Sequence, residues 1–124
     1  MKKYSETHEW VECTHSHAKV GITKVALEEI GEVVFIELPR VGSHLQKGDV
    51  ACVLESTKAA IDVMCPLSGV VKEVNTLVSD NLDLLNRSSE ESGWLFQLEL
   101  THPEEQDALF EEKDYYNMVK KSAS

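Results

Sequence analysis

Short apolar stretches separated by turn residues run along most of the chain. In residues 94–100, every second residue from Trp94 to Leu100 is large and apolar, which is the pattern of a strand with one buried face. Several other stretches are rich in β-branched and aromatic residues and end at glycine or proline. Many short strands arranged in this way favour an all-β barrel or sandwich. The predicted strands cover residues 10–11, 18–22, 33–38, 49–55, 61–64, 70–74 and 94–100.

Three segments depart from this pattern and predict short helices. Thr23 is a suitable N-cap for a helix over residues 24–30, and Gly31 is a suitable end for it. Residues 80–86 predict a second helical turn. Residues 101–104 have the spacing of a capping box, and the apolar positions that follow predict one or two C-terminal helices. The expected fold is therefore mainly β with a few short helices.

The size and composition of the chain fit one globular domain over residues 1–124. Its 124 residues are 42% hydrophobic and 27% charged, which is an ordinary balance for a folded domain. The 12 Lys and Arg against 22 Asp and Glu give a formal charge of −10, which argues against nucleic acid and anionic membranes as partners. No apolar run predicts a secretory signal or a membrane span. We therefore expect a cytoplasmic protein of bacterial type, with a trimmed mitochondrial protein as the alternative.

The cysteines and histidines do not form a recognisable metal or disulfide pattern. The three cysteines form no CxxC pair and no paired framework, which suits a reducing compartment. Cys13, His15 and His17 would share one face of a continuous strand, but no fourth ligand is evident. We therefore expect residues 12–17 to form a solvated hairpin loop with no metal bound.

The most informative segment, residues 48–69, places a lysine between two strand-like runs. Gly48 and Gly69 each lie about ten residues from Lys58, so the segment predicts a hairpin with Lys58 at or next to its tip. A Schiff-base enzyme that uses Lys58 as its nucleophile is disfavoured, because catalytic lysines need burial or a cationic neighbour. The hairpin instead presents an amine for enzymatic acylation, which removes the charge and can attach a cofactor.

The residues around this lysine resemble the lipoylation site of the glycine cleavage system H protein family. The resemblance rests on residues 55–59, which read ESTKA, followed by Asp62 and by PLSG at residues 66–69. Further blocks match the family in order and at the right spacing, so the resemblance covers nearly the whole chain. These blocks are residues 8–11, 20–23, 31–39, 41–42, 73–75 and 93–95, with Tyr4 before the first of them.

The resemblance implies a carrier rather than an enzyme. Lys58 would bear lipoic acid in amide linkage, on the flattened β-barrel, or barrel-sandwich hybrid, that biotinyl and lipoyl domains share. The implied partners are glycine decarboxylase (P protein), the aminomethyltransferase (T protein) and dihydrolipoyl dehydrogenase (L protein), together with the enzymes that attach lipoate. The carrier would take an aminomethyl group from the P protein to the T protein and pass electrons to the L protein.

The resemblance also implies four residues that shelter the aminomethyl group. Family members use residues of the opening motif and residues just after the modified lysine for this purpose. Carried over to this chain, these residues are Thr7, Glu9, Ile22 and Asp62. Glu9 or Asp62 would pair with the ammonium, and Ile22 would screen it from water. The other interpretation of the two carboxylates is that they are solvated surface groups.

Some positions depart from the family pattern. Thr57 stands where many relatives have Val, and Cys65 stands where they have Ser, but neither change removes the acceptor lysine. Residues 81–92, which we expect to lie in a loop, depart more, because Ser-Glu at residues 89–90 replaces a Pro-Tyr pair.

Other carrier classes are the alternatives to this interpretation. Some relatives of the H protein act as lipoyl donors or relays for other lipoate-dependent enzymes. A biotinyl domain would show Met-Lys-Met at the hairpin tip, and a lipoyl domain of a 2-oxoacid dehydrogenase complex would show Asp-Lys-Ala. Here Lys58 lies between Thr57 and Ala59. The intact mass of the protein would distinguish the lipoyl, biotinyl and unmodified forms.

Overall fold

The computed structural model describes residues 2–123, which form two antiparallel sheets and several short helices. The strands are β1 (Lys2–Tyr4), β2 (Glu9–Thr14), β3 (His17–Ile22), β4 (Val33–Glu37), β5 (His44–Leu45), β6 (Val50–Ser56), β7 (Ala60–Met64), β8 (Gly69–Val74) and β9 (Phe96–Leu100). The helices are α1 (Lys24–Ile30), α2 (Thr76–Asp80), α3 (Asp83–Ser88), the 3₁₀ helix η1 (Pro103–Ala108) and α4 (Glu112–Ala123). Within residues 2–123, no helix has the length and apolar character needed to cross a membrane.

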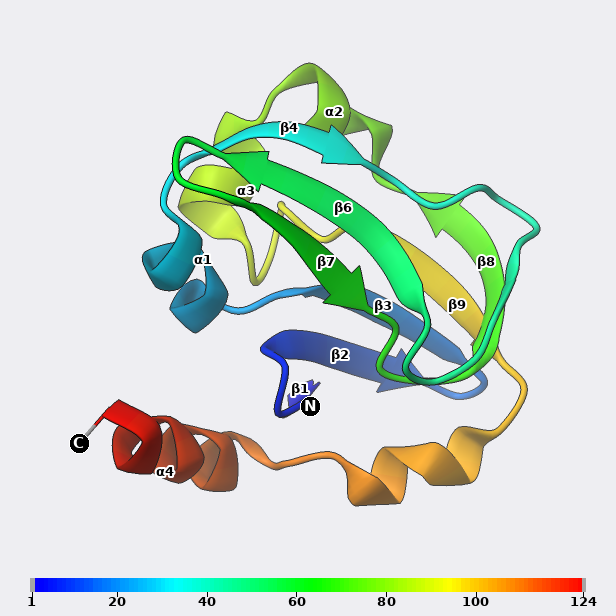
Figure 1. The fold of residues 1–124 in the computed structure, drawn as a ribbon. Coiled ribbons are helices and arrows are strands. Elements are labelled where there is room, and N and C mark those ends of the chain that lie inside the picture. Colours follow the sequence, from blue (N-terminus) through cyan, green and yellow to red (C-terminus); the bar gives the residue numbers. More distant parts are fainter. Residues whose placement is uncertain (1, 124) are drawn as a thin grey trace.

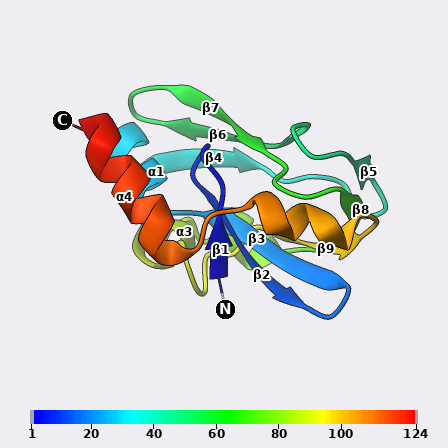
Figure 2. The same cartoon turned by 90° about the horizontal axis from the view of Figure 1, so that it is seen from below.

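The strands form two layers with the core between them. One sheet has the order β1-β2-β3-β9-β8-β5, and the other has the order β4-β6-β7. Figure 1 shows β4, β6 and β7 in front of the larger sheet, and Figure 2 shows the two layers from below. Val20 of β3, Leu54 of β6 and Leu98 of β9 are fully buried in one shared core. The prediction of a mainly β fold with short helices is therefore confirmed.

The first hairpin is longer than the sequence predicts. Strands β2 and β3 pair as far as Thr14 opposite His17, so the turn contains only His15 and Ser16. His15 has a φ of 55°, in the left-handed region that a tight turn requires. The prediction of a loop over residues 12–17 is wrong, because polar residues on the solvated face of a strand resemble a loop in the sequence. Cys13 and His17 consequently lie on two neighbouring strands rather than on one.

The predicted helices over residues 24–30 and at the C-terminus are confirmed, whereas the helical turn at residues 80–86 and the capping box are corrected. The Thr23 hydroxyl accepts a hydrogen bond from the Ala26 N–H at 3.3 Å, and Gly31 ends α1 with a φ of 81°. The single turn predicted over residues 80–86 is instead two helices, α2 and α3. The capping box predicted at residues 101–104 does not form, because η1 begins at Pro103 and this makes His102 the cap residue.

The C-terminal segment passes along the edge of the larger sheet and returns to the N-terminus (Figure 2). Tyr4 and Phe110 exchange two backbone hydrogen bonds, each of 2.8 Å. Beyond Phe110, α4 buries Tyr115 in a second apolar cluster with Tyr4 and Trp10. The rings of Tyr4 and Tyr115 stack with their centroids 4.8 Å apart. Aromatic packing therefore fixes α4 against β1 and β2.

Residues 81–92 are partly helical rather than a loop, and they contain a buried serine. Ser89, at the end of α3, is 3% exposed, and its carbonyl accepts a hydrogen bond of 2.9 Å from the Trp10 indole N–H. The Ser89 hydroxyl has no hydrogen-bond partner among the residues that the structure describes. An unpaired buried hydroxyl loses its hydration and gains nothing in return, so it destabilises the fold.

We expect Ser89→Ala to stabilise the protein by about 1 kcal/mol, because it removes this unpaired hydroxyl and keeps the backbone contact with Trp10. Thermal or urea unfolding measures the change. The matched control is Ser88→Ala, since the Ser88 hydroxyl accepts a hydrogen bond from the Ser92 N–H at 3.3 Å. Ser88→Ala should leave stability unchanged or lower it. Destabilisation by Ser89→Ala would show that its hydroxyl has a favourable contact.

Candidate functional site

Lys58 lies at the tip of the β6–β7 hairpin. The strands pair up to Glu55 opposite Ala60, and the Ser56 N–H then donates to the Ala59 carbonyl at 2.8 Å. The Ser56 hydroxyl oxygen accepts hydrogen bonds from the N–H groups of Lys58, at 3.1 Å, and Ala59, at 3.0 Å. These contacts order the turn while the side chain of Lys58 stays exposed. The predicted position of this lysine at the tip is confirmed.

The hairpin tip contacts the segment that follows α1 (Figure 1). The Thr57 N–H donates to the carbonyl of Glu32 at 3.2 Å. A Cβ atom built on Gly31 would lie 3.7 Å from Cε of Lys58 and from Oγ1 of Thr57. Gly31, with its positive φ, therefore lets the chain leave α1 directly beside the lysine stem. The result is an accessible amine on an ordered support, which fits enzymatic acylation.

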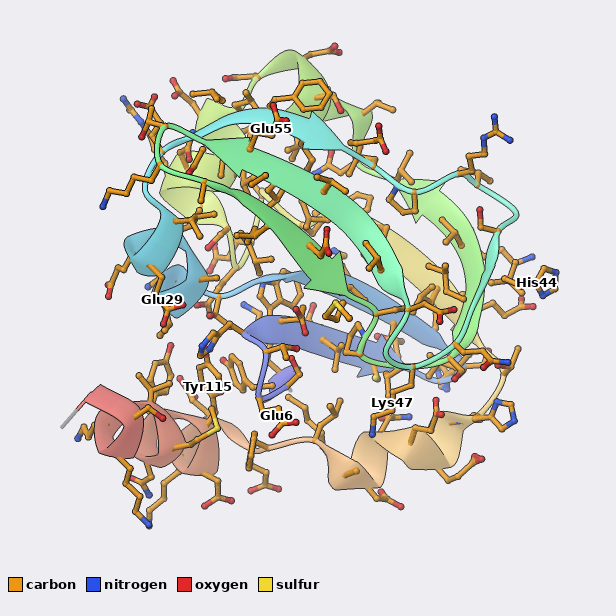
Figure 3. The ribbon with its side chains drawn as sticks, in the orientation of Figure 1. Glu6, Glu29, His44, Lys47, Glu55 and Tyr115 are labelled. Atoms are coloured by element: carbon orange, nitrogen blue, oxygen red, sulfur yellow. The ribbon has the colours of Figure 1, made fainter. Side chains whose placement is uncertain are left out.

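A cavity of about 350 Å³ lies between the sheets and the C-terminal segment. One wall comes from residues 4–7 and Glu9, another from residues 47–48 and 64–66, and the third from residues 108–110. Figure 3 shows Glu6 and Lys47 in the space between the strands and the C-terminal segment. The wall is mostly apolar, with a few polar groups that converge on Glu9, as is common in ligand sites.

Glu9 is the buried carboxyl group of this cavity. Glu9 is only 2% exposed. Its Oε1 accepts hydrogen bonds from the hydroxyls of Ser5, at 2.6 Å, and Thr7, at 2.5 Å. Its Oε2 accepts a hydrogen bond of 3.3 Å from the Met64 N–H at the end of β7. Burial raises the pKa of Glu9, and these hydrogen bonds oppose the rise. Glu9 is therefore not a solvated surface carboxylate.

The carboxylate of Glu9 has hydrogen-bond donors but no cationic partner. Within residues 2–123, no ion pair includes Glu9. A buried carboxylate is much more stable when a cation compensates its charge. The site is therefore suited to a small ligand or a tethered group that carries an ammonium.

The four predicted sheltering residues do not all reach the cavity. Thr7 and Glu9 lie together in its wall. Ile22 is the cross-strand partner of Glu9, but its side chain belongs to the main core. Asp62 is exposed on β7, opposite Val53, and does not line the cavity. The roles assigned to Ile22 and Asp62 remain predictions.

Sequence reasoning missed two parts of the site. Ser5 donates to Glu9, and the alternation of Ser5, Thr7 and Glu9 along the chain could have indicated it. The C-terminal wall, including Leu109 and Phe110, carries no sequence signal because it depends on contacts between the two ends of the chain. These contacts add the third wall of the cavity at this edge of the sheet.

Other chemistry at this site is disfavoured by its environment. Cys65 lines the cavity, but burial raises the pKa of its thiol to about 12, so the reactive thiolate is scarce at neutral pH. In the described part of the chain, no three His, Cys, Asp or Glu side chains are grouped so that they could hold a metal ion. The exposed Lys58 and the buried Glu9 are thus the two groups that define the site.

Two packed antiparallel sheets with an exposed lysine at a hairpin tip define a lipoyl-domain-like protein. The glycine cleavage H-protein family matches residues 2–122, and the chain belongs to this family. It is 45% identical over 115 residues to the glycine cleavage system H protein of Thermotoga maritima, with 93% of each chain covered. It is 44% identical over 117 residues to that of Endomicrobium trichonymphae, with 94% of each covered. The crystal structure of a glycine cleavage system H protein from Mycobacterium marinum aligns with a TM-score of 0.88 at 30% identity and covers 96% of each chain.

Membership of this family has consequences for function at a coarse level. It supports a role in the glycine cleavage system as a carrier subunit, and it implies a lipoyl cofactor. The system itself implies P, T and L proteins as partners. The residues of this chain fit a lipoyl group, because an accessible lysine stands on an ordered turn and a cavity with an uncompensated carboxylate lies at the other end of β7.

Proposed function

We propose that this chain is the lipoyl carrier of the glycine cleavage system and that Lys58 is its attachment site. It takes the aminomethyl group from the P protein to the T protein and passes electrons to dihydrolipoyl dehydrogenase. The chain is not itself an enzyme in this proposal. The observation that carries it is the buried carboxylate of Glu9, which accepts three hydrogen bonds and, among residues 2–123, forms no ion pair.

The hairpin geometry explains why a long attached group is needed. Lys58 precedes β7, and Met64, which donates to Glu9, ends it. Six residues of extended chain span about 20 Å, which is more than a lysine side chain covers. A lysine extended by a long acyl chain can serve both the distant active sites of partner enzymes and a cavity on its own protein. Bound lipoate would supply a disulfide that accepts the aminomethyl group and later returns two electrons.

The residues of the cavity protect a basic amine in two ways. Glu9 accepts charge-assisted hydrogen bonds from an ammonium, while Ser5 and Thr7 hold the carboxylate in place. The apolar side chains of Met64 and Phe110 exclude water, which would otherwise hydrolyse the aminomethyl group. Glu9 is thus a binding group for the cargo, and no proton transfer by the protein is required.

The acidic surface supports encounters with several larger partners. Acylation of Lys58 removes one positive charge, so the formal charge of −10 becomes −11. We expect kcat/KM for loading by the P protein to fall by roughly 3- to 10-fold between low and physiological ionic strength, with kcat unchanged. Steady-state kinetics in increasing NaCl measure this dependence. Rates that do not change with salt would contradict electrostatic steering.

A reconstituted glycine cleavage reaction tests the proposed function. The lipoylated chain is mixed with purified P, T and L proteins, glycine, tetrahydrofolate and NAD. We expect NADH to form only when the lipoylated chain is present, and the unmodified chain to be inactive. No NADH formation, together with transfer of the lipoyl group to another lipoate-dependent protein, would instead show a lipoyl relay.

A further inference from the structure

The backbone of His8, between Thr7 and Glu9, adopts a rare conformation. Its φ is 73°, in the left-handed region that residues other than glycine seldom occupy. Its N–H donates to the Ser5 carbonyl at 3.2 Å, which closes a tight turn over residues 5–8. Such a conformation persists only when its surroundings fix it. The contacts that fix His8 therefore also determine how Thr7 and Glu9 face each other.

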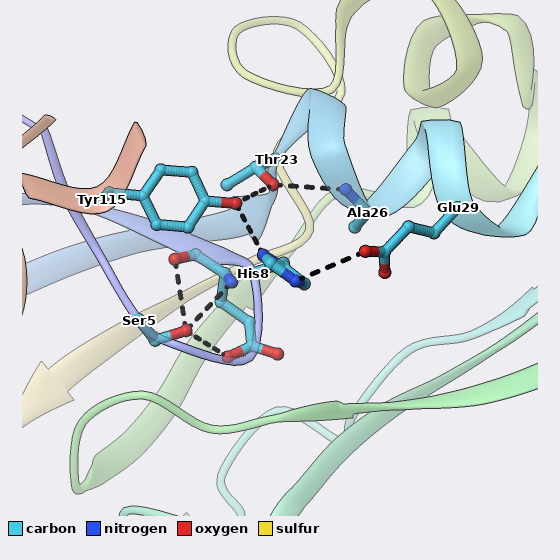
Figure 4. Close-up of polar contacts among 7 residues, drawn as sticks. Ser5, His8, Thr23, Ala26, Glu29 and Tyr115 are labelled. Carbon is cyan, nitrogen blue, oxygen red and sulfur yellow. Dashed lines mark hydrogen bonds and ion pairs between the residues drawn. The ribbon is translucent and has the colours of Figure 1, made fainter. Parts of the chain in front are cut away.

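Three contacts, one from α4 and two from α1 and its cap residue, hold His8 in place (Figure 4). Its Nδ1 lies 2.7 Å from the hydroxyl of Tyr115 on α4. Its carbonyl accepts a hydrogen bond of 3.0 Å from the N–H of Thr23, the cap residue of α1. Its Nε2 lies 3.7 Å from Oε1 of Glu29, which is exposed. The contact with Tyr115 is the shortest of these, and it comes from a residue 107 positions away in the sequence.

Tyr115 is itself held rigidly. It is fully buried, and its ring stacks on Tyr4. Its hydroxyl lies 2.7 Å from the Thr23 hydroxyl, which in turn accepts from the Ala26 N–H. One arrangement of protons satisfies every group: Thr23 donates to Tyr115, and Tyr115 donates to Nδ1 of His8. Burial raises the pKa of Tyr115 to about 12, so its hydroxyl keeps the proton that this arrangement requires.

We propose that Tyr115 is a positioning residue for Glu9. Through His8, it holds residues 5–9 in the conformation in which Ser5 and Thr7 donate to the carboxylate. The C-terminal helix thus contributes to the cargo cavity without lining it at this position. This inference rests on the proposed function, in which Glu9 binds the ammonium of the cargo.

Loss of the Tyr115 hydroxyl has a definite consequence. Without it, Nδ1 of His8 loses its partner and the backbone can relax toward a common φ. The relaxation turns Thr7 relative to Glu9 and weakens the 2.5 Å hydrogen bond between them. Because hydrogen bonds to the carboxylate lower the pKa of Glu9, weakening them raises it.

The test compares Tyr115→Phe with Tyr116→Phe in the full chain. Tyr115→Phe keeps the ring that stacks on Tyr4, so α4 stays docked. Tyr116 is the neighbouring tyrosine, and among residues 2–123 no hydrogen bond from its hydroxyl is found. We expect Tyr115→Phe to raise the pKa of Glu9 by roughly 0.5 to 1, as measured by ¹³C NMR titration of the unmodified protein. Tyr116→Phe should leave the pKa of Glu9 unchanged.

A second readout uses the loaded carrier. We expect Tyr115→Phe to release formaldehyde about fivefold faster, the factor that the loss of one neutral hydrogen bond produces. His8→Ala should have the same two effects. The double variant should differ little from either single variant, because both changes break the same hydrogen bond between His8 and Tyr115. Val78→Ala removes buried side-chain volume in α2 and controls for general destabilisation.

The results separate this inference from the proposed function. If Tyr115→Phe leaves the pKa of Glu9 and the release rate unchanged while Glu9→Gln accelerates release, the positioning role is overturned and the cargo role of Glu9 stands. An equal change in Val78→Ala would also overturn it. If Glu9→Gln leaves release unchanged, the cargo role of Glu9 fails, and the pKa of Glu9 in the unmodified protein still decides the positioning role.

Discussion

Lys58→Arg is expected to abolish lipoylation completely and to leave the fold intact. Arginine keeps the positive charge and much of the stem, but a guanidinium does not form the amide that lipoate requires. The side chain of Lys58 is exposed, and the turn is ordered by the Ser56 hydroxyl and by backbone contacts, so stability should not change. Intact mass after incubation with lipoate, ATP and a lipoate-attaching enzyme measures the result.

Lys72→Arg is the matched control for this experiment. Lys72 is also an exposed lysine, but it lies on strand β8 of the larger sheet, with its Nζ 3.9 Å from a carboxylate oxygen of Glu99. It should accept one lipoyl group as the wild type does, and both variants should unfold at the wild-type temperature. A lipoyl group on Lys58→Arg would contradict the assigned attachment site.

Glu9→Gln is expected to shorten the lifetime of the loaded carrier without preventing lipoylation. The amide keeps the shape of the carboxylate but removes the charge that would pair with the ammonium. A hydrogen bond to a charged group contributes about 1.5–3 kcal/mol, so release of formaldehyde and ammonia should be roughly 10- to 100-fold faster. The release rate from the isolated loaded protein is the measurement, and unchanged release would contradict the role of Glu9.

The control for Glu9→Gln lies on the same strand. Glu12 is exposed on β2 and pairs in register with Lys19 of β3, away from the cavity. Glu12→Gln removes the same charge and should leave the release rate within about twofold of the wild type, as expected for a screened surface group.

The stability of Glu9→Gln should depend on pH in a defined direction. Burial raises the pKa of Glu9 in the folded state, so the folded state binds more protons than the unfolded state. The stability contributed by this group is therefore greatest below its unfolded pKa and is lost as the pH rises through its folded pKa. Relative to the wild type, Glu9→Gln should be most stable at pH values above the folded pKa of Glu9. This advantage should disappear at pH values below the unfolded pKa. A carboxylate retained in spite of this destabilisation is consistent with a role in binding.

The local features of the site could be predicted from the sequence. The two runs around Lys58, bounded by glycines, predict the hairpin because strand pairing follows directly from neighbouring segments. Thr23 and Gly31 predict the limits of α1 for the same reason, since capping involves only adjacent residues. The burial of Glu9 could not be predicted in this way. It depends on Met64 and on Phe110, which are far from it in sequence.

The errors have physical causes as well. Glu12 and Thr14 look like part of a loop, but their backbone groups extend the β2–β3 ladder while their side chains are exposed, and Cys13 between them packs partly against the core. The proline at residue 103 marks the first residue of η1, so the capping position falls on His102 and not on Thr101. In both places the backbone hydrogen bonds decided the structure, and side-chain polarity gave no indication of it.

The most direct test of the account follows the carbon of glycine onto the protein. The lipoylated chain is incubated with the P protein and with glycine labelled with ¹³C at C2, the carbon that decarboxylation leaves on the carrier, and the mass of the intact, folded protein is then measured. The account predicts that the lipoylated chain gains the mass of one labelled aminomethyl group, and that Lys58→Arg gains none. Label on Lys58→Arg, or no label on a fully lipoylated chain, would contradict it.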